Sequence, residues 1–138
     1  MSFNNSNMKN LDEIFLKIKH MLEKHSNDFY TAERYIDSKA KDKKPAYHVY
    51  GNKEVSLFGK DPQKTYIAGI IQQKNYVSFY FNPIYSHPDE FRNISPALNK
   101  FLKGKSCFNI NNLSPSLLEE IESLLLKGIE KYKDIEWI

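Results

Sequence analysis

Two strand-like runs separated by only two residues constrain this chain more than any other feature. The runs are Thr65–Gln73 and Tyr76–Phe81, with Lys74 and Asn75 between them. Such a short connection is typical of a tight hairpin of antiparallel strands. With Lys74 and Asn75 in the loop, the register predicts three facing pairs on the core side of the hairpin: Gln72 with Val77, Ile70 with Phe79, and Ala68 with Phe81.

The opposite face of this hairpin is half polar and carries the candidate ligand site. The same register places Ile71 opposite Ser78 and Gly69 opposite Tyr80, and an aromatic ring over a glycine covers exposed backbone. Tyrosine and serine hydroxyls can orient a polar ligand in a partly apolar pocket. The alternative is that a helix covers this face. The predicted ligand-binding set is Gly69, Tyr76, Ser78, Tyr80 and Lys105.

Capping signals predict three main helices around the strands. Asn10 precedes an apolar stripe that ends near His25, and Ser-Pro pairs at 95–96 and 114–115 open two more helices. The helix from Pro96 is expected to end at a Gly104 cap. Ser86 is expected to cap a short helix through Asp89.

Turn signals divide the middle of the chain into short strands. Residues 47–50 stop at Gly51-Asn52, residues 55–58 stop at Gly59, and residues 107–110 form a last short strand. We therefore expect one α+β domain over residues 1–138. It should hold an antiparallel sheet of about five strands, flanked by an N-terminal helix and C-terminal helices, with residues 1–9 frayed.

Composition narrows the class of protein. With one cysteine, Cys107, no internal disulfide can form, and a secreted disulfide scaffold is excluded. No apolar run approaches a membrane span, and residues 1–10 lack a signal-peptide core, so we expect a cytoplasmic protein with no membrane partner. The net charge of +3 is almost all lysine, and the arginines are Arg34 and Arg92. This scarcity of arginine argues against a dedicated nucleic-acid partner.

No group of residues predicts a catalytic or metal site. The segment Gly104–Ser106 matches the end of a phosphate-binding P-loop, but Asn99 replaces its first glycine, and the helix comes before the strand. No histidine or cysteine has a partner at metal-ligand spacing, which excludes a closed zinc site but not an open metal site built from residues distant in the chain. Cys107 is one candidate nucleophile, although a buried structural thiol is commoner. We expect no catalytic residues and no metal ligands, and the sequence names no cofactor.

Five segments in the second half of the chain carry a family resemblance: Tyr76–Phe79, Asn82–Tyr85, Ser95–Lys100, Gly104–Asn109 and Gly128–Tyr132. Together they resemble the bacterial domain-of-unknown-function family 1801, the YdhG-like proteins. The resemblance implies an α+β domain with an antiparallel sheet flanked by helices. Some relatives are described as frataxin-like iron chaperones, a role that needs exposed oxygen ligands for iron.

These observations favour a binding module over an enzyme. We expect a non-catalytic bacterial protein that binds a small molecule or a protein partner. The alternative, by resemblance alone, is a frataxin-like intracellular iron chaperone, but the first helix mixes its acidic residues with lysines and supplies no iron ligands that we can name. The sequence leaves homo-oligomerisation open.

Overall fold

The predicted hairpin forms the middle of a six-stranded antiparallel sheet. In the computed structural model, which describes residues 7–34 and 44–138, the strands are β1 (Tyr30–Ala32), β2 (Ala46–Val55), β3 (Gln63–Gln72), β4 (Val77–Phe81), β5 (Leu102–Lys103) and β6 (Cys107–Ile110). Their order across the sheet is β1-β2-β3-β4-β6-β5. Strands β4 and β6 are therefore neighbours in space, although residues 82–106 separate them in the chain.

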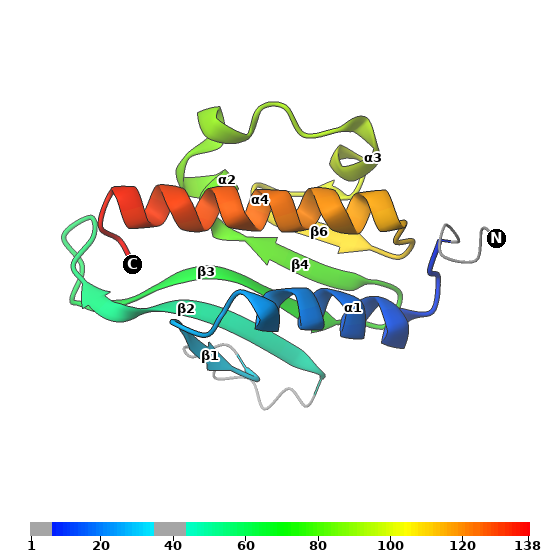
Figure 1. The fold of residues 1–138 in the computed structure, drawn as a ribbon, viewed down its shortest axis with the longest axis horizontal. Helices are drawn as coiled ribbons and strands as arrows, with labels where there is room; N and C mark the ends of the chain where they lie inside the picture. Colours follow the sequence, from blue (N-terminus) through cyan, green and yellow to red (C-terminus); the bar gives the residue numbers. More distant parts are fainter. Residues whose placement is uncertain (1–6, 35–43) are drawn as a thin grey trace.

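Two long helices lie side by side on one face of this sheet (Figure 1). They are α1 (Leu11–Lys24) and α4 (Pro115–Asp134). The connection from β4 towards β6 carries three short helices: α2 (Asn82–Ser86), the 3-10 helix η2 (Pro88–Phe91) and α3 (Pro96–Asn99). The predicted α+β fold with an antiparallel sheet flanked by N-terminal and C-terminal helices is confirmed, with six strands rather than about five.

The predicted caps of the three main helices are confirmed. Each capping oxygen accepts a hydrogen bond from the backbone N–H three residues later, which satisfies a group that the first helical turn leaves unpaired. The three bonds, of 3.1, 3.2 and 3.0 Å, run from Glu13 to Asn10, from Leu98 to Ser95, and from Leu117 to Ser114.

The hairpin register is also as predicted, and it fixes where the core lies. Gln72 pairs with Val77, Ile70 with Phe79 and Ala68 with Phe81. All of these residues except Gln72 are fully buried. They pack against the apolar stripes of α1 and α4, which include Ile14, Ile18, Ile121 and Tyr132. One face of the sheet therefore forms the core with both long helices.

Gly51 is not the predicted turn. Strand β2 runs through it, with irregular pairing to β3 after Tyr50, and the chain reverses at Phe58-Gly59 instead. The side chain of Ile138 covers Gly51 so closely that its Cγ2 would lie 2.5 Å from a Cβ at that position. This glycine therefore allows a close approach of the chain's last residue and does not mark a loop.

Two further predicted caps are wrong. Helix α3 ends at Asn99, and Gly104, with a φ of +69°, sits in the turn between β5 and β6. Ser86 is the last residue of α2 and bonds to the Tyr132 hydroxyl at 2.6 Å, so η2 begins without a side-chain cap. At Ser86 the contact with Tyr132 takes the place of the predicted cap, and at Gly104 the pairing of β5 with β6 does so.

The start of the described chain is paired. Met8 and Leu113 exchange two backbone hydrogen bonds of 2.7 and 2.8 Å, so the expected frayed start does not reach Met8, while residues 1–6 lie outside the described part. Among the described residues, no helix combines the length and the apolar character needed to cross a membrane.

Candidate functional site

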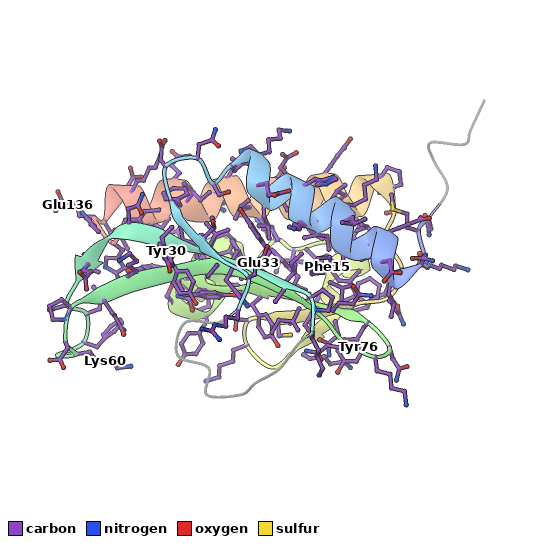
Figure 2. All side chains as sticks on the ribbon, turned by 90° about the horizontal axis from the view of Figure 1, so that it is seen from below. Phe15, Tyr30, Glu33, Lys60, Tyr76 and Glu136 are labelled. Carbon is purple, nitrogen blue, oxygen red and sulfur yellow. The ribbon has the colours of Figure 1, made fainter. Side chains whose placement is uncertain are left out.

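The structure separates the predicted ligand-binding residues into three places. Gly69, Ser78 and Tyr80 lie on the sheet face opposite the core, because they alternate with buried core residues along β3 and β4. Tyr76 lies beside the β3–β4 turn, at one end of the sheet (Figure 2). Lys105 belongs to the β5–β6 turn, next to the other end of β4, since the neighbouring Ser106 carbonyl accepts a hydrogen bond from the Phe81 N–H. Five residues of strand separate these ends by roughly 17 Å, so the set does not form one pocket.

Gly69 has a packing role. It faces Tyr80 as predicted, but the atoms directly above it belong to His48 and Tyr66, and a Cβ at Gly69 would collide with both. His48 Nδ1 and the Tyr66 hydroxyl are 2.8 Å apart and hydrogen-bonded. Burial lowers the pKa of His48 to about 4, so this imidazole is neutral at pH 7.

Ser78 is closed off from solvent. Only 2% of the residue is exposed, and its hydroxyl donates to Asn109 Oδ1 at 3.0 Å. The Cys107 thiol shares that acceptor at 3.3 Å. Burial raises the pKa of the Cys107 thiol and of the Tyr80 phenol, so both stay protonated at neutral pH. These groups satisfy one another, and a protonated thiol is a poor nucleophile.

Lys105 lies in a different setting, a hollow of about 710 Å³ that we call the Lys105 hollow. It opens between the short helices and the β5–β6 turn. Its walls are Ile84, Tyr85, Pro88, Phe91, Arg92, Ile94, Pro96, Asn99, Leu102, Gly104 and Lys105.

Contacts to the sheet and to α4 hold these walls in place. Phe91 of η2 meets the buried Phe81 ring edge-on, with the ring centroids 5.2 Å apart. Ahead of α3, the Ser95 N–H donates to the Glu120 carboxylate at 2.9 Å. Gly104 adopts the positive φ that the β5–β6 turn requires, and this turn presents Lys105.

The Lys105 hollow combines an apolar floor with positive charge. The Lys105 ammonium lies over the Tyr85 ring, 5.7 Å from its centroid, and Tyr85 is 58% exposed. Arg92 is the other charged residue of the lining and bonds to the exposed Asp89 at 2.6 Å. Both charged groups of the lining are cations, so the hollow suits an organic anion with an apolar body.

Sequence reasoning selected Lys105 but missed Tyr85, Arg92 and Asn99. Tyr85 and Asn99 fall in segments that carry the family resemblance, yet nothing in their spacing brings them to Lys105. They meet because β4 and β6 are neighbours in the sheet, which closes the intervening connection into a loop.

No metal site is evident in the part of the chain that is described. Residues 7–34 and 44–138 contain no group of three or more His, Cys, Asp or Glu residues placed to hold a metal ion. The iron-chaperone alternative is therefore carried by the resemblance alone.

Comparisons with models of known families, with curated proteins and with solved structures gave no match. The resemblance to the YdhG-like proteins stays a prediction.

Proposed function

We propose that this chain is a non-catalytic binding module for a small organic anion, which it holds in the Lys105 hollow. The observation that carries the proposal is the Lys105 ammonium placed over the Tyr85 ring, in a hollow whose two charged lining residues are both cations. Of the two kinds of partner that the sequence left open, a hollow of this volume favours a small molecule, because sites for such ligands measure about 300–1,000 Å³. A cytoplasmic location belongs to the same proposal, on the ground of the free thiol of Cys107.

The recognition divides between charge and apolar contact. The anionic group would lie against Lys105 and Arg92, and a guanidinium can bind a phosphate or carboxylate through two parallel hydrogen bonds. The apolar body would rest on Phe91, Ile94 and Leu102, which line the same hollow. Since neither cation is buried, salt should weaken this binding.

Calorimetric titration with phenyl phosphate tests the proposal, with benzylamine as a cation of similar shape. We expect phenyl phosphate to bind the native protein and benzylamine not to bind. Lys105→Ala should weaken phenyl phosphate binding about tenfold or more, which corresponds to about 1.4 kcal/mol. Lys103→Ala, at an exposed lysine of β5 outside the lining, should leave it unchanged.

Three results would count against the proposal. They are an absence of phenyl phosphate binding at millimolar concentration, equal affinity in Lys105→Ala and the native protein, and benzylamine binding as tight as that of phenyl phosphate. The first result would show that the ligand class is wrong, and the second would show that the site is not at Lys105. The third would show that charge does not select the ligand.

A further inference from the structure

A second hollow shares Tyr85 with the Lys105 hollow, and five of its twelve lining residues are aromatic. We call it the aromatic hollow. Its volume is about 260 Å³, just below the range of about 300–1,000 Å³ for drug-sized ligands. It therefore suits one planar ring system. The rings that line it are Tyr50, Phe58, Tyr66, Tyr85 and Trp137.

Phe58 enters this lining in a backbone conformation that phenylalanine disfavours. Its φ is +56°, and that of Gly59 is +73°. The Lys60 N–H donates to the Leu57 carbonyl at 3.0 Å, so Phe58 and Gly59 are the two central residues of a tight turn. Glycine or asparagine would adopt this position more readily.

Burial does not compensate this strain, because Phe58 is 83% exposed. Its ring meets Trp137 edge-on, with the centroids 5.9 Å apart. Strained residues persist mainly where their conformation serves a contact or a reaction. The exposed ring of Phe58 therefore points to a contact with something that binds in the aromatic hollow.

Tyr85 joins the two hollows. It lines both of them, it is 58% exposed, and Lys105 lies over its ring on the side of the Lys105 hollow. A molecule that extends past the Tyr85 ring would occupy both hollows at once.

The charges around both hollows select the kind of molecule. Lys60 and Lys64 line the aromatic hollow, as Arg92 and Lys105 line the other one, and no acidic residue lines either. Acidic neighbours are close to three of the four cations: Asp89 bonds to Arg92, Glu54 pairs with Lys64 across β2 and β3, and Asp61 follows Lys60 in the chain. Within the described residues, no ion pair involves Lys60 or Lys105. Aromatic cages usually hold organic cations, and the lysines would repel such a guest.

From these observations we propose that the two hollows are the halves of one nucleotide site. The planar base lies in the aromatic hollow against the exposed Phe58 ring, beside Trp137, while the phosphates bind at Lys105 and Arg92, and Tyr85 lies between base and phosphates. This inference rests on the proposed function, because the phosphate end of the nucleotide uses the Lys105 hollow.

Trp137 makes the test direct, because it is the chain's one tryptophan and it lines the aromatic hollow. The probes are adenosine diphosphate, adenosine, inorganic pyrophosphate and phenyl phosphate, titrated while tryptophan fluorescence and calorimetric affinity are recorded. Adenosine diphosphate should quench Trp137. Adenosine should bind at least about tenfold more weakly than adenosine diphosphate. Inorganic pyrophosphate should displace phenyl phosphate without quenching the fluorescence of Trp137.

Two variants separate the halves of the site. Phe58→Gly removes the ring, and glycine suits the positive φ, so the variant should keep the fold and the affinity for phenyl phosphate. It should weaken the binding of adenosine diphosphate about tenfold. Lys105→Ala should weaken both ligands. Leu16→Ala is the control, because it shortens an exposed apolar side chain of α1. It should change neither affinity.

The outcomes distinguish this inference from the proposed function. If phenyl phosphate depends on Lys105 while adenosine diphosphate neither quenches Trp137 nor responds to Phe58→Gly, the nucleotide site is wrong and the anion site stands. If Lys105→Ala affects neither ligand, both proposals are wrong. An adenine tetranucleotide that binds more than about tenfold tighter than adenosine diphosphate would assign the surface to single-stranded nucleic acid and overturn the nucleotide proposal.

Discussion

A methyl group added at Gly69 would collide with His48 and Tyr66, which are hydrogen-bonded to each other above this glycine. His48 is almost fully buried, and the backbone carbonyl of Tyr47 would lie 3.0 Å from the added methyl group, so Gly69→Ala should lower the free energy of unfolding by about 2–3 kcal/mol. Urea denaturation measures the change. Gly59→Ala is the control, because its φ is positive but nothing lies within 4 Å of its Cβ position, and strain alone costs about 1 kcal/mol. A smaller effect at Gly69 than at Gly59 would contradict this account.

For Phe58 we expect a substitution to have the opposite effect on stability. Glycine at this position relieves a left-handed conformation that costs about 1 kcal/mol. It also loses an exposed ring contact with Trp137, which at about 0.5 kcal/mol is worth less. The thermal midpoint of Phe58→Gly should therefore be equal to or above that of the native protein. A clear fall would show that the ring stabilises the fold, which would remove the argument that it is displayed for a ligand.

At the scale of elements, one carboxylate ties α1 to α4. Glu122 of α4 accepts hydrogen bonds from His25 at 2.6 Å and from Lys24 at 3.0 Å. The hydrogen bond from His25, followed by that from Lys24, holds the pKa of the Glu122 carboxyl below its usual 4.5. Because the folded pKa is the lower one, this contribution is complete above the unfolded pKa and is lost as the pH falls through the folded value.

Glu122→Gln should therefore destabilise the protein at pH 7 by about 0.5–1 kcal/mol, the usual range for a partly exposed pair. The difference from the native protein should disappear at an acid pH below the folded-state pKa of this carboxyl, where Glu122 is protonated in both the folded and the unfolded state. Urea denaturation at both pH values measures it. Glu119→Gln, at an exposed residue of the same helix, should have no comparable effect at either pH. A loss that persists in acid would exclude the ion pair as its cause.

Elements were predictable where the local signal and the tertiary structure agreed. The caps at Asn10, Ser95 and Ser114 and the two-residue hairpin loop depend on residues close in the chain, and each was confirmed. The predicted turn at Gly51 and the predicted helix cap at Gly104 were wrong. Glycine also occurs where the chain approaches another segment closely or adopts a positive φ, and not only in turns and caps. The reason for Gly51 is Ile138, which is 87 positions away in the sequence, so no local rule could find it.

At the scale of the whole molecule, ligand binding should be visible as stability. A ligand that binds only the folded state at a concentration 100 times its dissociation constant adds about 2.7 kcal/mol to the free energy of unfolding. Saturating adenosine diphosphate should therefore raise the thermal midpoint of the native protein, and the rise should shrink in Lys105→Ala. An equal rise in both proteins would place the nucleotide outside the Lys105 hollow.

The candidate site was less predictable than the fold. The sequence favoured the polar sheet face because alternation of residues in a strand is a local pattern, but Ser78 there is buried and satisfied by Asn109. The contact between Lys105 and Tyr85 depends on which strands become neighbours. The hairpin register could be worked out from two loop residues, whereas the pairing of β4 with β6 leaves no comparable signature in the chain.

That pairing also decides how freely the site can change. Residues 82–106 form an excursion between two strands that already pair with each other, and this excursion supplies all the walls of the Lys105 hollow. Substitutions there can alter the choice of ligand while the hydrogen bonds between β4 and β6 stay as they are. The fold thus separates the part that must stay constant from the part that evolution or a protein engineer can vary to make a family of binders with different specificities.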